Sequence, residues 1–180
     1  TIIENAAAEP EIVDLTDFLI KQGAKINGSG SDTIKIEGVE ELTPTIHKVI
    51  SDRIEAGTFM TAFAMTRGHG IIKNANYEHI KPVAAKLMEM GVEISEQADG
   101  SIKVNGERSL KTTDIKTRPF PGFPTDMQAP FTVLLSTLEG TGIIIETVFE
   151  NRFLHIGELN RMGADIRIDG RTSVIEGSRQ

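Results

Sequence analysis

The sequence contains no cysteine, no tryptophan and no long uncharged apolar segment. The absence of cysteine excludes a disulfide framework, a thiolate zinc site and a cysteine nucleophile within these residues. With only eight phenylalanines and one tyrosine, the core must consist mainly of aliphatic side chains. Acidic residues outnumber basic ones by 26 to 19, which argues against binding nucleic-acid phosphates through a basic face. No stretch approaches the ~18 apolar residues that span a bilayer, so no membrane partner is expected.

What the chain does contain is the composition of an ordinary folded protein. Its 180 residues are enough for one large domain or two small ones with a buried core. The chain opens with Thr1 and has no charged leader segment, so we expect a cytoplasmic location. Because it lacks an initiator methionine, we also expect it to be cut from a longer chain.

A repeated pattern organises the sequence. Gly23 and Gly91 follow the amphipathic segments 10–22 and 78–90, and Gly163 ends a third such segment. A glycine in this place, followed by alternating apolar residues, is typical of a helix end that leads into a strand. A polar turn and a second short strand follow each time, and each second strand then meets a glycine. These second strands are predicted at residues 33–36, 101–104 and 172–175.

Two further helices are predicted between these segments. Asp52 opens one and Asp126 the other, and each carboxylate would lie at a helix N-terminus, where it can cap free N–H groups. Residues 56–65 and 127–138 are apolar nearly all round, so we expect both helices to be buried on every side. Strands are predicted after them at residues 71–74 and 143–149. The repeating unit is therefore β-α-β-α-β-β, an α/β arrangement.

Four motifs make the sequence more specific. They are ENAAAEPEIVD at residues 4–14, DRIEAGT at 52–58, FPTDMQA at 123–129 and ETVFENRF at 146–153. In this order they closely resemble the UDP-N-acetylglucosamine enolpyruvyl transferases, bacterial enzymes of peptidoglycan synthesis. The resemblance extends over nearly the whole chain.

The resemblance implies a fold. Members of this family consist of two inside-out α/β barrels, each built from three β-α-β-α-β-β units, with the substrates bound between them. Residues 1–50 would form the last part of one barrel, and residues 51–180 would form two units of the second. The chain would thus be an internal or C-terminal portion of the enzyme. Its protein partners would be the remaining segments of its parent chain or a second copy.

The resemblance also implies a reaction. The enolpyruvyl group of phosphoenolpyruvate would be transferred to the 3-hydroxyl of UDP-N-acetylglucosamine, with release of phosphate and without a metal or organic cofactor. The family's catalytic acid and its lysine–asparagine pair would precede Thr1, and its closing arginines would follow Gln180. We therefore expect the 180 residues alone to make no product. Two alternatives stay open: a 5-enolpyruvylshikimate-3-phosphate synthase-like enzyme, and a non-catalytic binding or structural fragment.

The resemblance assigns roles to individual residues. Asp126 would orient the sugar hydroxyl and take its proton, with Thr125 beside it in the same motif. The backbone of Val148 and the neighbouring Phe149 would contact the UDP-sugar. Arg152 would meet negative charge in the cleft between the barrels.

Further candidates have simpler explanations beside them. Asp52 would mark the crossing between the domains, with Glu9 and Arg53 as weaker cleft candidates. Aspartate is a preferred N-cap, and an acid beside a proline commonly starts a helix, so capping explains these residues without a ligand. From the sequence alone, Asp126 can also be explained as a helix cap, and Arg152 as a surface residue in an ion pair. The resemblance to the family favours a role in the substrate site for both. The four histidines show no ligand spacing, so no metal site is expected.

Overall fold

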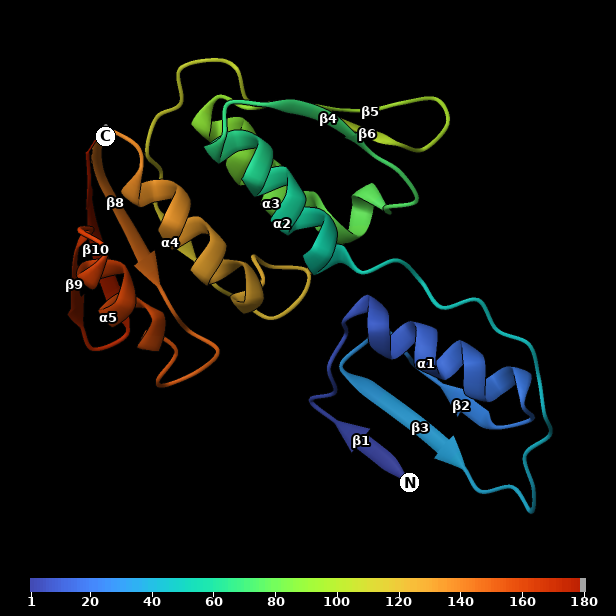
Figure 1. The fold of residues 1–180 in the computed structure, drawn as a ribbon. Helices are drawn as coiled ribbons and strands as arrows, with labels where there is room; N and C mark the ends of the chain where they lie inside the picture. Colours follow the sequence, from blue (N-terminus) through green and yellow to red (C-terminus); the bar gives the residue numbers. More distant parts are fainter. Residues whose placement is uncertain (179–180) are drawn as a thin grey trace. The chain divides into compact units, whose positions relative to one another are not determined.

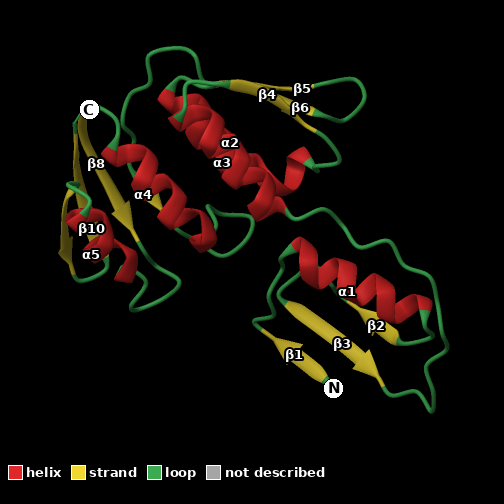
Figure 2. Ribbon diagram, viewed as in Figure 1, coloured by secondary structure: helices red, strands yellow, loops and turns green. Residues whose placement is uncertain are grey.

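The computed structural model of the chain describes residues 1–178, which divide into two compact units. Residues 1–51 and 119–121 belong to the first unit, and residues 52–118 and those from 122 onward belong to the second. Helices and strands alternate in both units (Figure 2), which confirms the predicted α/β class. The closure of a barrel, and the assignment of the two parts of the chain to two barrels, stay predictions.

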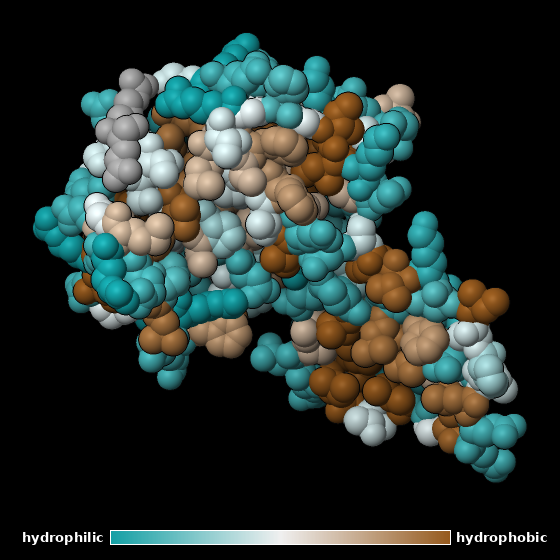
Figure 3. Space-filling view, in the orientation of Figure 1, coloured by the Kyte–Doolittle hydropathy of each residue, from teal (hydrophilic) through white to brown (hydrophobic). Residues whose placement is uncertain are grey.

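The first unit is a helix on a small antiparallel sheet (Figure 1). Its elements are β1 (Ile2–Glu4), α1 (Pro10–Lys21), β2 (Lys25–Asn27) and β3 (Thr33–Glu37). The strand order is β1-β3-β2, and α1 packs against β2. Figure 3 shows apolar side chains at the surface of this unit, and the exposed ones include Ile2, Ile46 and Val49. The helix predicted over residues 10–22 is confirmed.

The second unit contains two successive repeats. The first repeat consists of α2 (Arg53–Met65), β4 (His69–Ile72), α3 (Tyr77–Met90), β5 (Glu93–Glu96) and β6 (Ile102–Asn105). The second consists of β7 (Ile115–Lys116), the 3-10 helix η1 (Thr125–Met127), α4 (Gln128–Ser136), β8 (Gly140–Ile145), α5 (Leu154–Arg161), β9 (Asp165–Asp169) and β10 (Thr172–Gly177). In the described residues, the second repeat has all six elements of the predicted β-α-β-α-β-β unit.

Strand order confirms the internal repeat. The sheets contain the antiparallel arrangements β1-β3-β2, β4-β6-β5 and β8-β10-β9, so the last strand of each repeat lies in the middle every time. In the last sheet, β7 adds in parallel beside β8, with Ile115 opposite Ile144. The predicted helix-ending glycines also agree, because Gly23, Gly91 and Gly163 all have a positive φ, a conformation that side chains disfavour.

Gly106 serves close packing rather than backbone conformation. A Cβ atom at this position would lie 2.7 Å from the carbonyl oxygen of Phe63 and 2.8 Å from the Cα of Ala64, both near the end of α2. The backbone after β6 can therefore approach the helix only without a side chain. At Gly38, which follows β3 in the first unit, nothing lies within 4 Å of such an atom.

The core of the second unit lies between its helices and sheets. Helix α2 contacts both α3 and α4, and Met60, Leu87 and Phe131 are fully buried there. The prediction that α2 is buried on every side is wrong, because Phe59 is 54% exposed and Met65 is 39% exposed. Within the second unit, the neighbouring helices cover the face of α2 that carries Met60, and the exposed Phe59 and Met65 lie outside that face.

Candidate functional site

Asp126 forms an ion pair and does not cap a helix. It lies in η1, which Pro124 precedes with an extended backbone, and neither η1 nor α4 has a side-chain cap. Its Oδ1 accepts a hydrogen bond from Nη2 of Arg152 at 2.5 Å. The alternative that Asp126 is an N-cap is therefore wrong. The Asp126 side chain is 48% exposed and that of Arg152 is 35% exposed, so a ligand can reach both.

Arg152 brings several predicted site residues together. Besides its bond to Asp126, its Nη1 donates to the hydroxyl of Thr125 at 2.9 Å. Its guanidinium carbon lies 5.1 Å from the centre of the Phe149 ring, within the range of a cation–π interaction. Asp126, Thr125, Phe149 and Arg152 thus form one connected group, which we call the acid–arginine cluster.

A buried carboxylate, Glu146, lies beneath this cluster. Its Oε2 accepts from the hydroxyl of Thr125 at 2.8 Å, and its Oε1 accepts from the hydroxyl of Thr117, also at 2.8 Å. Oε1 also accepts from the backbone N–H groups of Val148 and Phe149, at 2.8 and 3.1 Å. Burial on its own would raise the pKa of Glu146, but these four hydrogen bonds outweigh it and hold the pKa below its usual value.

Glu146 also ends strand β8. The strand predicted over residues 143–149 stops at Ile145, so that prediction is wrong at its C-terminal end. The N–H of Glu146 still donates to the carbonyl of Arg171, just before β10. After Glu146 the chain leaves the sheet, because the N–H groups of Val148 and Phe149 bond to the Glu146 carboxylate and that of Thr147 bonds to the Thr117 hydroxyl. The resulting turn carries the chain towards Arg152.

Thr117 joins this turn to the loop that precedes Asp126. The residue is fully buried just after β7, and Thr147 Oγ1 donates to its carbonyl oxygen at 2.5 Å. The proline-rich loop that follows is closed at its base, where the N–H of Arg118 donates to the carbonyl of Phe123 at 2.8 Å. Both chain segments that carry the acid–arginine cluster therefore start from the same pair of parallel strands, β7 and β8.

Two functional candidates were missed by the sequence analysis. Glu146 and Thr117 received no role there, although Glu146 was part of a motif. The signal for Glu146 was an acid directly after Ile143, Ile144 and Ile145, where a strand that enters a core should stay apolar. Thr117 has no comparable signal, because threonine is common in strands.

His155 lies in α5 beside the cluster and is half-buried. Burial lowers its pKa, and the charge of Arg152 lowers it further, so protonation of the imidazole is disfavoured. Its Nε2 is buried and has no hydrogen-bond partner within residues 1–178. A second positive charge in the cluster from this residue is thus disfavoured.

The remaining candidates lie at helix starts. Asp52 caps α2, since its Oδ1 accepts from the N–H groups of Ile54 at 2.7 Å and Glu55 at 3.1 Å; capping explains it. Arg53 is the first residue of α2 and is half-buried. Glu9 precedes α1 in the first unit and makes no capping bond through its side chain. A cleft role for these three residues stays a prediction.

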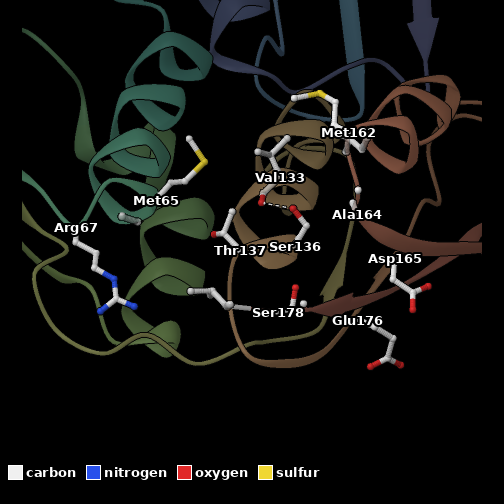
Figure 4. Close-up of a pocket in the computed structure, with 15 residues that line it drawn as sticks. Met65, Arg67, Val133, Ser136, Thr137, Met162, Ala164, Asp165, Glu176 and Ser178 are labelled. Carbon is white, nitrogen blue, oxygen red and sulfur yellow. Dashed lines mark hydrogen bonds between the residues drawn. The ribbon is translucent and has the colours of Figure 1, made fainter. Parts of the chain in front are cut away.

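The structure also contains a groove that none of the predicted site residues lines (Figure 4). It has a volume of about 870 Å³ and runs between the end of α2, α4 and the segment after α5. Its lining includes Met65, Arg67, Val133, Met162 and Glu176.

Within the described part of the chain, no group of three or more His, Cys, Asp or Glu side chains could hold a metal ion. No helix there is long and apolar enough to cross a membrane.

Sequence comparison finds relatives named UDP-N-acetylglucosamine 1-carboxyvinyltransferase. The chain is 58% identical over 177 residues to UDP-N-acetylglucosamine 1-carboxyvinyltransferase 1 of Caldanaerobacter subterraneus subsp. tengcongensis, covering 98% of this chain and 42% of the relative. It is 56% identical over 180 residues to UDP-N-acetylglucosamine 1-carboxyvinyltransferase 2 of Clostridium tetani, covering all of this chain and 43% of the relative. These matches confirm the resemblance to that family. The chain spans less than half the length of the curated relatives it matches.

Structural comparison agrees on the fold. The enolpyruvyl transferase NikO from Streptomyces tendae matches with a TM-score of 0.80 at 22% identity, covering 98% of this chain and 42% of that one. An EPSP synthase from Acinetobacter baumannii matches with a TM-score of 0.65 at 21% identity, covering 92% and 40%. The sequence profile of the EPSP synthase (3-phosphoshikimate 1-carboxyvinyltransferase) family matches residues 1–180. The chain therefore belongs to the EPSP synthase family and has the fold of the enolpyruvyl transferases.

Proposed function

We propose that this chain is part of an enzyme that transfers the enolpyruvyl group of phosphoenolpyruvate to the 3-hydroxyl of UDP-N-acetylglucosamine, in peptidoglycan precursor synthesis. Identities of 55% to 58% with relatives named for that sugar nucleotide support the choice of acceptor. The observation that carries the proposal is the ion pair between Asp126 and Arg152. It holds a carboxylate and a guanidinium together where a ligand can reach both.

Asp126 has the chemistry that the acceptor side of this reaction needs. Its carboxylate can accept a hydrogen bond from the sugar 3-hydroxyl and orient the oxygen towards C2 of phosphoenolpyruvate. As the new C–O bond forms, the hydroxyl proton passes to the carboxylate, while the enol carbon gains a proton from an acid elsewhere. Loss of a proton from the same carbon and of phosphate from C2 then restores the double bond. General base catalysis of this kind contributes about 10²–10⁴-fold.

Arg152 supplies the positive charge. Both substrates are anionic, and a guanidinium stays protonated at any physiological pH. The bonds from its two terminal nitrogens to Thr125 and Asp126 fix the planar group at two points, so its charge is held in one place. The neighbouring His155 has a lowered pKa, which disfavours a second positive charge beside Arg152.

The segment at Val148 and Phe149 would contact the sugar nucleotide. The backbone N–H groups of both residues already donate to Glu146. Contacts from this segment therefore fall to its carbonyl groups and to the Phe149 ring, which is exposed. A ring at the surface offers an apolar face on which a sugar or a base can stack.

The whole enzyme would be cytoplasmic and would consist of two inside-out barrels, with residues 1–50 in one and 51–180 in the other. The exposed face of α2 around Phe59 supports a further repeat that packs there. Asp52 is a substrate-binding candidate at the crossing between the barrels, with Glu9 and Arg53 as weaker candidates for the cleft. The protonating acid and the groups that hold phosphoenolpyruvate would lie on other parts of the parent chain.

The test is an acceptor assay with the full-length protein that contains this chain. Phosphate release from phosphoenolpyruvate is measured with UDP-N-acetylglucosamine or with shikimate 3-phosphate as acceptor, and the product is identified by mass. We expect product only with the sugar nucleotide. Product only with shikimate 3-phosphate would instead support the synthase alternative, and product with neither would refute a transferase function.

The Asp126→Asn variant tests the assigned base. We expect a fall in kcat of about 10²-fold or more, with little change in thermal stability. Asp165→Asn is the matched control, because Asp165 is an exposed acid in β9 outside the cluster.

We expect the isolated 180-residue chain to make no product and to bind UDP-N-acetylglucosamine weakly. Saturable binding in a titration with UDP-N-acetylglucosamine would support a transferase fragment, and no binding would support an inert one.

A further inference from the structure

Glu146 is an unusual residue in this fold. Within residues 1–178 it is the only acidic or basic side chain in the buried class, with an exposed fraction of 1%. Removing a carboxylate from water is unfavourable unless hydrogen bonds and nearby positive charge compensate it. A neutral residue here would avoid that cost, so the charge needs an explanation in what Glu146 contacts.

Each oxygen of Glu146 holds a different part of the site. Oε2 binds the hydroxyl of Thr125, the residue next to Asp126. Oε1 binds the N–H groups of Val148 and Phe149 and so shapes the turn that leads to Arg152. The two chain segments that form the acid–arginine cluster are therefore joined through one side chain.

Thr125 transmits this connection to the guanidinium. Its hydroxyl donates to Glu146 and accepts from Nη1 of Arg152, whose Nη2 donates to Asp126. The negative charge of Glu146 orients the hydroxyl hydrogen and leaves the hydroxyl oxygen available to the arginine. Arg152 is thereby held at two points, and Asp126 is held by Arg152.

We propose that Glu146 is a positioning residue for the reaction: it places Asp126 and Arg152, and the turn at Val148 and Phe149, without touching the substrate. This inference rests on the proposed function. The role requires an ionised carboxylate, because only a group that accepts at both oxygens can hold Thr125 and the turn at once. The four hydrogen bonds supply those donors.

Glutamine at this position is the informative substitution. The carbonyl of Gln keeps the acceptor for Thr117 and the two N–H groups, so the turn and the volume are preserved. Its NH₂ group replaces Oε2 and cannot accept from Thr125. The Thr125 hydroxyl would have to turn round and lose its acceptor, and the negative charge near Arg152 would be gone.

The experiment measures steady-state kinetics of the full-length protein that contains this chain, as wild type, Glu146→Gln, Thr125→Val and the double variant. For Glu146→Gln we expect the KM for UDP-N-acetylglucosamine to rise and kcat/KM to fall by roughly 10- to 100-fold. The double variant should lose little more than Thr125→Val alone, because both changes break the same connection. The control is Glu89→Gln, which removes another carboxylate that accepts from a threonine hydroxyl, that of Thr113, and should leave KM unchanged.

The outcomes separate positioning from mere stabilisation. A purely structural role would reduce the amount of active protein and hence the apparent kcat, but leave KM as in the wild type; that result overturns the inference. Additive losses in the double variant overturn the route through Thr125. If Glu146→Gln does not fold, Thr117→Val, which removes one donor to the same carboxylate, takes its place, and an unchanged KM has the same meaning. A wild type without enolpyruvyl transfer refutes the proposed function itself.

Discussion

Arg152 and Asp126 lie 26 residues apart in the sequence, and Nη2 of the arginine donates to Oδ1 of the aspartate at 2.5 Å. Helix α4, strand β8 and the turn around Glu146 separate them along the chain. The pair exists because β7 and β8 run in parallel, so that the segments following both strands meet at one edge of the sheet. Ligands commonly bind beyond the carboxyl ends of parallel strands in α/β proteins.

Replacing Arg152 with lysine tests whether the geometry of the cation matters in addition to its charge. Lysine keeps the positive charge but cannot bond to Asp126 and Thr125 through a planar fork. We expect kcat/KM of the full-length enzyme to fall by about 10-fold or more, with unchanged thermal stability. Arg161→Lys, at an exposed ion pair with Glu158, is the control. Full activity of Arg152→Lys would mean that charge alone suffices.

Stability at acid pH should depend on Glu146. Its folded-state pKa is lowered, so its ionised form contributes stability that is fully present above the unfolded value of about 4.3. That contribution is lost as the pH falls through the folded-state value. We expect the free energy of unfolding to decline below about pH 5 in the wild type, and less steeply in Glu146→Gln. Urea unfolding over a pH series measures both slopes, and parallel curves would contradict the prediction.

The close approach at Gly106 should make it intolerant of a side chain. In Gly106→Ala, the new methyl group would lie 2.7 Å from the carbonyl oxygen of Phe63 and 2.8 Å from the Cα of Ala64, closer than van der Waals contact allows. We expect a loss of about 1–3 kcal/mol in the free energy of unfolding. Gly38→Ala is the matched control, since the space around its Cβ position is open. Denaturant unfolding measures the free energy of unfolding of both variants. Equal values would show that the backbone after β6 can move away from α2.

Much of the local structure could be predicted because its causes are local. The glycines at 23, 91 and 163 end helices through their own backbone freedom, and apolar spacing of 3.6 residues defines α1 and α3. The same spacing recurs along the chain, so the repeat could also be recognised. The motifs at 123–129 and 146–153 identified which residues to examine, including Asp126, Thr125 and Arg152.

The predictions were wrong where a distant part of the chain determines the local structure. Asp126 has the sequence signature of a cap, yet its carboxylate binds Arg152, because a guanidinium 26 residues away competes with the local N–H groups. The apolar run after Gly140 predicted a longer strand, yet the buried Glu146 side chain takes the N–H groups of Val148 and Phe149. Helix α2 has apolar residues all round, but only its neighbours determine which of them are buried.

The sequence by itself determined the repeat, the positions of the helices and the family, because these follow from short-range spacing and from motifs. Only the tertiary structure decided that Glu146 links the two chain segments of the acid–arginine cluster and that Thr117 bonds to it. The physical reason is that a buried carboxylate is stable only where donors converge on it, and its donors come from residues 117, 125, 148 and 149. No spacing within one segment of the chain contains that information.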